Sequence, residues 1–350
     1  MSKSIITQDE LKQYQQAGLF NSVKTMDGGF GGLTTPNVNM PAGILTKISP
    51  YIVSIITRKR TADEVVGRRM KVLDWEQEDL LMPIVEQKGE TANYSDFGNP
   101  PTASMNPTYI YAGHQRISID VVNGRLKNAQ LAQSRINGEA YNMSTALEKL
   151  AISFNNIAFN GVPGIPEGSK YPIYGILNNP DLPAYQAADT TTANASFETF
   201  YKDVVNLIND VIAQSMGHVT PDSRMVLALS NKRAGLLSLL NQIGNKTVKA
   251  AIAESYPNLK WVLSPELDGA YTGGLDVMYL RAESLDETRV KEEGLQADTL
   301  VDSAILGFSE LARAGAIETH SNYTSQTMSS GTVGAIVSRP FMFARRYFAS

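Results

Sequence analysis

The sequence predicts an α+β fold, and three of its features lead to that prediction. The first is a long amphipathic helix between Arg135 and Asn160. The second is a set of extended segments with alternating apolar residues, which lie before this helix and at the end of the chain. The third is an alternation of strands and helices between residues 217 and 310. Helices and strands grouped in separate blocks are typical of an α+β architecture with more than one packed layer.

The predicted long helix carries its apolar side chains on one stripe. Consecutive stripe positions are separated alternately by four and three residues, which places all of them on one helix face. At about 1.5 Å per residue such a helix extends roughly 38 Å and needs a surface along its length. We expect it to end at Asn160 and Gly161, with Asn155 on the opposite, solvent-exposed face. The stripe consists of Ile136, Ala140, Met143, Leu147, Leu150, Phe154 and Ile157.

Residues 70–121 are predicted to form a long β-hairpin. One limb contains Leu80–Val85, and the return limb contains Thr108–Tyr111 followed by Arg116–Val121, where apolar and polar residues alternate strictly. The tip, from about residue 86 to 107, is rich in glycine, asparagine and proline. A loop of this length without its own core is uncommon in a compact domain and is usually functional.

Residues 1–50 are predicted to be an N-terminal arm. A glycine-rich run from Asp27 to Gly32 follows a short polar helix and leads to Thr34. A phosphate-binding loop would instead follow a strand and begin a helix, so a flexible joint is the preferred interpretation. A densely basic segment from Arg58 to Lys71 lies between the arm and the hairpin.

The second half of the chain is predicted to contain an α/β unit and a β-rich tail. A helix from Phe197 to Met216 precedes strands at 224–229, 259–263 and 277–280, with helices at 231–240 and 247–255 between them. The tail segments 316–319, 332–338 and 341–347 alternate as strands do. We expect these three strands to lie beside the hairpin base and the long helix.

The composition excludes several classes of function. The chain has no cysteine, which rules out disulfides, thiol catalysis and cysteine-ligated metals. Its net charge is −4, whereas a protein that reads nucleic acid sequence is usually basic. No apolar run reaches the length of about 18 residues that a membrane helix requires, so no membrane partner is expected.

The sequence shows no catalytic or cofactor-binding motif. The three histidines, His114, His218 and His320, are not spaced as metal ligands. No nucleophile elbow, Walker loop or zinc-protease motif occurs. We therefore expect neither an enzyme nor a cofactor, although a soluble α+β enzyme assembled from distant residues remains an alternative.

The order of these parts resembles the major capsid protein of tailed bacteriophages, with the Hong Kong 97-type fold. Local similarity lies in Leu150–Gly161, in Gly175–Pro180 and in Ser338–Pro340. The resemblance covers essentially the whole chain. It implies five parts: an N-terminal arm at 1–60, an extended loop at 61–120, a peripheral domain with the long "spine" helix at 121–216, an axial domain at 217–310, and return strands of the peripheral domain at 311–350.

The resemblance also implies a function and partners. Such subunits assemble as hexamers and pentamers into an icosahedral or prolate head that encloses double-stranded DNA. Expected partners are further copies of the chain, a portal, a decoration protein and non-specifically contacted DNA. Because the arm is short, we expect scaffolding to come from a separate protein. The protein would be part of the virion and would assemble in the cytoplasm of the bacterial host. An encapsulin-like bacterial compartment is the alternative, which the long arm and hairpin disfavour.

Opposite charges in the arm and the loop suggest a contact between subunits. We expect the acidic loop of one subunit to lie over the basic segment of the next. The basic residues are Arg58, Lys59, Arg60, Arg68 and Arg69, and the acidic residues are Glu76, Glu78, Asp79, Glu86, Glu90 and Asp96.

Overall fold

A computed structural model describes residues 59–349 except 94–95, 97, 99–100, 134–136, 192, 242–243 and 286–299, and leaves out the side chains of 85–88. The expectations for the arm up to Arg58, for Ile136 and for the side chain of Glu86 therefore lie outside the described residues. Residues 54–350 form one compact unit, and the fold described below is that of this unit.

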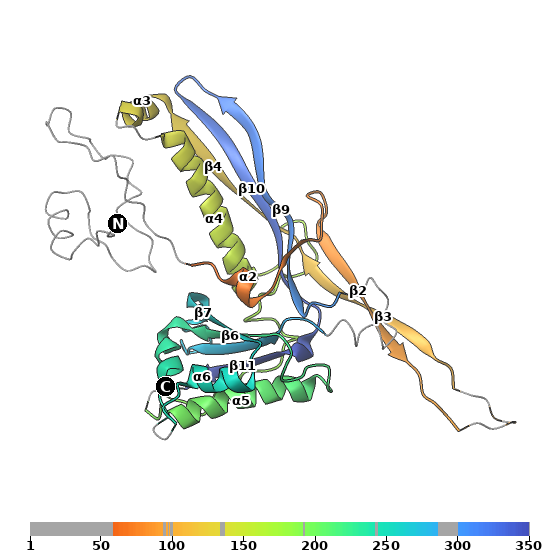
Figure 1. Ribbon diagram of the computed structural model, residues 1–350. Helices are drawn as coiled ribbons and strands as arrows, with labels where there is room; N and C mark the ends of the chain where they lie inside the picture. Colours follow the sequence, from red (N-terminus) through yellow and green to blue (C-terminus); the bar gives the residue numbers. More distant parts are fainter. Residues whose placement is uncertain are drawn as a thin grey trace. The chain divides into compact units, whose positions relative to one another are not determined.

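One layer of the fold is a five-stranded mixed sheet with the strand order β5-β11-β8-β6-β7. Its two central strands are buried along their whole length because helices and loops cover both of their faces. Helix α5 packs against β8 and β11 (Figure 1). The elements are β5 (Gln186–Ala188), α5 (Phe197–Gln214), β6 (Met225–Ser230), α6 (Val248–Ser255), β7 (Leu259–Ser264), β8 (Val277–Ala282) and β11 (Phe343–Phe348).

The other large layer is a four-stranded sheet with the order β1-β9-β10-β4, along which the spine helix α4 lies (Figure 1). This confirms the expected position of the long helix beside strands from the tail. The elements are β1 (Arg69–Lys71), β4 (Gln115–Gly124), α3 (Arg125–Gln133), α4 (Gly138–Asn160), β9 (Ala304–Thr319) and β10 (Tyr323–Val337).

A separate two-stranded sheet forms the extended hairpin. It consists of β2 (Asp79–Lys88) and β3 (Ser104–Gly113), which pair from Asp79–Gly113 at the base to Lys88–Ser104 near the tip. Figure 1 shows this hairpin projecting away from the two larger sheets. The strands are longer than the sequence predicted, and they shorten the connecting tip to residues 89–103.

The spine helix begins later than expected. Asn137 is its N-cap, with the side-chain Oδ1 accepting a hydrogen bond from the Ala140 N–H at 3.2 Å. The helix therefore starts at Gly138, because the Asn137 side chain satisfies a free N–H group of the first turn. The C-terminal end lies at Gly161, as predicted, where φ is +69°. A Cβ atom at Gly161 would clash with the Ile173 carbonyl oxygen, so only glycine fits.

Only part of the predicted stripe is buried. Leu150, Phe154 and Ile157 are buried, whereas Ala140 and Leu147 are exposed. The sheet supplies only a small apolar cluster under the first turns of α4, built on Val121 and Met328. At the other end, Ala158 and Phe159 are buried as well, because their carbonyl groups accept hydrogen bonds from Ile176 and Leu177 of the following loop.

The expected exposure of Asn155 is wrong. Its Oδ1 accepts hydrogen bonds from the N–H groups of Thr61 (3.1 Å) and Ala62 (3.0 Å), at the start of the short helix α2 (Ala62–Val65). Its Nδ2 donates to Glu266 at 2.8 Å, and Glu266 also accepts from the Thr61 hydroxyl at 2.9 Å. This buried polar cluster ties the spine helix, the entry of the chain and the five-stranded sheet together.

Two predicted strand partners differ in the structure. Arg116–Val121 does not continue the hairpin but belongs to β4, which pairs with β10. The last strand, β11, pairs with β8 and β5 rather than beside the spine helix. The predicted peripheral segments 121–216 and 311–350 are therefore divided, since α5 and β11 belong with the five-stranded sheet. The predicted helix at 231–240 is a 3₁₀ helix, Asn231–Ser238.

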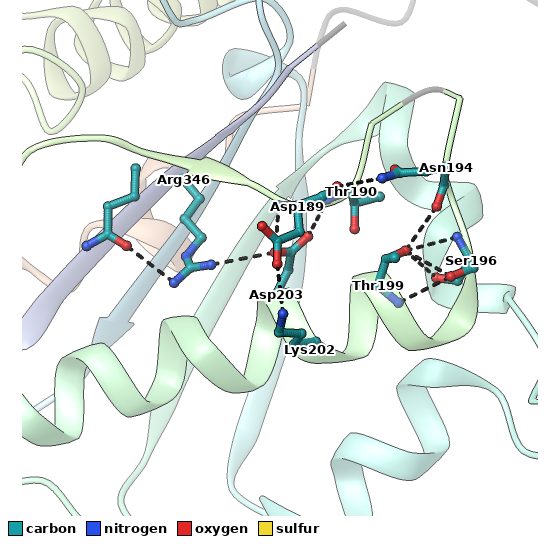
Figure 2. A network of polar contacts seen from close by, with 9 residues as sticks. Asp189, Thr190, Asn194, Ser196, Thr199, Lys202, Asp203 and Arg346 are labelled. Carbon is teal, nitrogen blue, oxygen red and sulfur yellow. Dashed lines mark hydrogen bonds and ion pairs between the residues drawn. The ribbon is translucent and has the colours of Figure 1, made fainter.

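Buried arginines explain why the last strand joins the five-stranded sheet. Arg345 donates to the carbonyl oxygens of Leu177, Leu182 and Pro183. Arg346 lies 3.5 Å from Asp203 (Figure 2). It also lies 2.8 Å from Asp210, and both aspartates are on α5. Buried charges need such partners, and β11 finds them only at this position.

Asp203 provides a test of this packing. It is fully buried and accepts hydrogen bonds from the N–H groups of Asp189 (2.9 Å) and Thr190 (2.8 Å), in addition to its ion pair with Arg346 (Figure 2). Replacing it by alanine leaves these donors buried without an acceptor, so Asp203→Ala should lower the free energy of unfolding by about 3 kcal/mol. Urea unfolding of the unassembled chain measures this.

The neighbouring Lys202 is the matched control. It pairs with Asp189 at 3.2 Å but is exposed (Figure 2). Lys202→Ala should therefore change the unfolding free energy by less than about 1 kcal/mol. Equal losses for the two variants would contradict the structural role given to Asp203.

Candidate inter-subunit surfaces

The hairpin presents two different faces. On one face, Leu80, Met82 and Ile110 belong to an apolar cluster that includes Ile305 and Val333 of the body. On the other, Leu81 is directly opposite Tyr111, and Pro83 is opposite Tyr109. Directly opposed residues of an antiparallel pair share a face, and all four of these side chains are exposed. The apolar cluster of the body therefore takes in only one face of the hairpin base, and the four side chains of the other face stay exposed.

The exposed face continues toward the tip along β3. Met105 and Pro107 follow the same alternation as Tyr109 and Tyr111, and all four are exposed. Met105 is 72% exposed and Tyr109 is 45% exposed. We call this surface the hairpin stripe: Leu81, Pro83, Met105, Pro107, Tyr109 and Tyr111. Continuous exposed apolar surfaces mark interaction sites, and tyrosine and methionine are enriched in interfaces.

A cleft of about 530 Å³ lies beside the stripe. Its walls are built from the hairpin base, from the end of β10 and from the connector after the spine helix. Tyr109 and Tyr111 line it together with Tyr174 and Val337. Tyr111 also stacks on Tyr171 of the connector, with ring centroids 4.6 Å apart. The cleft and the stripe thus form one apolar region.

A single residue, His114, joins the hairpin to the four-stranded sheet. It lies between β3 and β4 and is 1% exposed. Its Nδ1 is 2.7 Å from the Gln77 carbonyl oxygen, and its Nε2 is 2.8 Å from the Ser309 Oγ on β9. Since a carbonyl can only accept, Nδ1 carries the proton and Nε2 accepts from Ser309 in the neutral ring. An isolated histidine carries no sequence signal for this role.

Most of the basic residues already have acidic neighbours in their own chain. Lys59 lies 3.4 Å from Glu64, Arg68 lies 2.6 Å from Asp302, and Arg69 makes a two-pronged contact with Asp63. Arg60 is exposed. The structure therefore does not gather the predicted basic residues into one uncompensated patch, because each of the three pairs lowers the local charge.

The acidic residues divide into two groups. Glu76, Glu78, Glu90 and Asp96 are exposed. Asp79, in contrast, accepts hydrogen bonds from the Ser169 hydroxyl and from the Lys170 N–H (3.0 Å). It fastens the connector to the hairpin base, a role within its own chain that the sequence did not indicate.

Two specific features are absent from the described part of the chain: a metal-binding cluster and a membrane-spanning helix. Among these residues, no group of three or more histidine, aspartate or glutamate side chains could hold a metal ion. No helix in the described ranges is both long and apolar enough to cross a bilayer. The exposed surfaces of the hairpin and the sheets are therefore the best candidates for function.

Comparison with known proteins identifies the class. The family model of the Pa193 gp26 major capsid protein matches residues 32–347. The chain belongs to this major capsid protein family. No curated protein matches it. The predicted identity as a subunit of a phage capsid shell is thus confirmed, and the encapsulin-like alternative is disfavoured.

Solved structures confirm the Hong Kong 97-type fold of this capsid protein. The capsid of the Myoviridae phage XM1 matches with a TM-score of 0.69 and 12% identity, over 88% of this chain and 100% of that one. The capsid of the empty GTA particle matches with a TM-score of 0.56 and 12% identity, over 94% and 99% of the two chains. The structure from Gordonia phage Cozz matches with a TM-score of 0.55 and 12% identity, over 94% of this chain and 96% of that one.

Because His114 is buried, we expect the connection that it makes between the hairpin and the four-stranded sheet, here called the joint, to be sensitive to acid. Burial lowers the pKa of His114, the hydrogen bond to Gln77 raises it in part, and Arg116 lowers it again. A lowered pKa means that the folded state binds fewer protons than the unfolded chain. The joint is therefore fully stable above about pH 6.5, the ordinary histidine pKa, and loses stability as the pH falls through the lowered value.

Hydrogen exchange of the unassembled chain tests this joint. After correction for intrinsic rates, peptides covering residues 104–124 should exchange faster at pH 5 than at pH 7.5. His114→Gln should remove this pH dependence, whereas His320→Gln, at an exposed site, should retain it. An unchanged pH dependence in His114→Gln would contradict the assignment.

Proposed function

We propose that this capsid protein assembles as hexamers and pentamers into a closed icosahedral or prolate head around double-stranded DNA, and that each hairpin lies on a neighbouring subunit. The hairpin stripe carries this proposal. A two-stranded sheet is at best marginally stable alone, and this one joins the apolar cluster of the body only at its base and through one face. On the other face, Tyr111 stacks on Tyr171 but remains exposed. A neighbouring copy that covers the stripe would supply the missing contact.

The same subunit would act as structural material rather than as an enzyme. The described residues show no metal-binding cluster, and the cleft beside the stripe is lined mostly by apolar and aromatic side chains. A net charge of −4 fits a container that must release its DNA, because a strongly basic lining would retain the genome through counterion release. Assembly in the bacterial cytoplasm, with a separate scaffolding protein, a portal and a decoration protein, completes the proposal.

Charge would guide the contact between neighbours. The acidic residues near the hairpin tip, Glu90 and Asp96, are exposed. In the basic segment, Arg60 and Lys59 are two of the exposed cations and would face them, with the Lys59 side chain 63% exposed. Exposed charges chiefly steer association and fix its register, so we expect them to affect the rate and accuracy of assembly.

Substitutions in the stripe test the proposed function. Met105→Ser combined with Tyr109→Ser removes exposed apolar surface without touching the packed face of the hairpin. The unassembled variant should unfold within about 0.5 kcal/mol of the parent chain. Its yield of shells, counted by electron microscopy and light scattering, should fall sharply. Tyr141→Ser, at an exposed tyrosine of α4, is the control. Normal shell yield in the stripe variant would contradict the proposal.

Charge reversal tests the steering contact separately. Arg58→Glu, Lys59→Glu and Arg60→Glu together should slow assembly and make the remaining assembly less sensitive to salt. A compensating reversal at the hairpin tip, Glu90→Lys with Asp96→Lys, should restore the rate when combined with the first set in one chain. Unchanged assembly of the first variant, or no restoration by the second, would refute this contact.

A further inference from the structure

The strand β9 has a neighbour on only one side over most of its length. On one edge it pairs with β10 as far as Thr319. On the other, β1 pairs only with Leu306–Phe308. The residues from Leu311 to Thr319 are all exposed, and nothing in the described part of the chain covers their outer edge. This free edge is about 30 Å long at 3.4 Å per residue.

Free edges of this kind join to other strands unless a sequence protects them. This edge has little protection, because Leu311 is 42% exposed and Ile317 is 66% exposed. It carries one cation, Arg313, and one anion, Glu318. Arg313 lies 3.9 Å from Glu310 and 5.3 Å above the Trp75 ring, and Glu318 lies 3.8 Å from His320, so the ion pair that each residue makes in its own chain is long and exposed.

A β-bulge interrupts the edge between these two charges. From Ala314 to Ile317 the strand β9 advances three residues, while its partner β10 advances two, from Met328 to Gln326. The extra residue lies at Gly315–Ala316. In a regular strand, alternate residues direct their backbone N–H and C=O groups to the same edge. The bulge shifts this alternation by one residue between its two sides.

This shift makes the edge complementary to itself. When two copies meet antiparallel with a two-fold axis at Gly315–Ala316, Arg313 lies opposite Glu318 of the second copy, and Ala314 lies opposite its Ile317. In a strand without a bulge, such a register would place outward backbone groups against inward ones. With the bulge, the groups match on both sides of the axis. The contact then has an apolar centre flanked by two pairs of opposite charge.

We propose that the β9 edges of two capsid protein copies pair in this register, so that their four-stranded sheets become one continuous sheet. The inference rests on the proposed shell function and names one contact within it. A two-fold contact uses the same patch on both copies and closes after two chains. It would therefore link subunits of adjacent capsomers without forming filaments.

Cysteine cross-linking tests the register. The chain has no cysteine of its own, so Arg313→Cys with Glu318→Cys in one chain introduces the only thiols. Opposed positions of an antiparallel pair are close enough for a disulfide. Mild oxidation of assembled material should give covalent dimers and no larger species. Ser118→Cys with Asp120→Cys, at exposed positions of β4, is the control and should give none. A ladder of trimers and larger species would overturn the two-fold register.

Charge exchange identifies the occupant of the edge. Arg313→Glu or Glu318→Arg alone places like charges opposite each other twice and should reduce assembly. The double variant Arg313→Glu, Glu318→Arg should restore it, because both cross-copy pairs re-form. If the edge instead bound a decoration protein or the β4 edge of another copy, the double variant would stay defective, which would refute the inference.

The outcomes separate this inference from the proposed function. Shells that form without the 313–318 cross-link would contradict the edge pairing and leave the shell function standing. Cross-linked dimers without shells would support the edge pairing and contradict the shell function. If neither shells nor cross-linked dimers form, both the edge pairing and the shell function are refuted.

Discussion

The alternation of side chains along a β-strand is the constraint on which this structure depends. A two-stranded hairpin has two faces, and the body of the capsid protein can cover only the one that carries Leu80, Met82 and Ile110. The opposite face is apolar as well, with Tyr109 and Tyr111 exposed. The chain therefore builds a long element whose second face leaves apolar side chains exposed, and in the proposed shell a neighbouring subunit would cover them. The free edge of β9 likewise leaves backbone N–H and C=O groups without a partner strand.

Elements that project in this way need firm attachment, and buried polar groups supply it. His114 holds the hairpin base between the Gln77 carbonyl and Ser309. Asn155 caps α2 and contacts Glu266, which fixes the point where the arm meets the body. Hydrogen bonds of this kind cost stability when one partner is lost, but they define a single geometry. A shell needs that definition, because each subunit must present its stripe at the same place as every other copy.

Periodicity in the sequence predicted the elements well and their partners less well. The stripe positions from Ala140 to Ile157 lie in the spine helix as predicted, and the alternation in Arg116–Val121 was correct as a strand. The pattern could not show that β4 leaves the hairpin, since strand alternation carries no information on which edge pairs. It also could not show that Asn155 is buried. A polar residue on a helix is expected to face solvent, and the N–H groups of Thr61 and Ala62 that Asn155 binds are distant in sequence. The order of the parts, in contrast, identified the capsid family correctly. The charged residues of the predicted contact remain a prediction, and the structure adds the apolar stripe, which alternation from Met105 to Tyr111 could have revealed.

Electron cryo-microscopy of the shell formed by this chain tests the central claim most directly. The account predicts that every copy has its hairpin stripe covered by a neighbouring subunit, with Met105 and Tyr109 at the contact. Shells in which the stripe faces solvent in every copy would contradict it, because the hairpin would then persist without the contact that its exposed face requires.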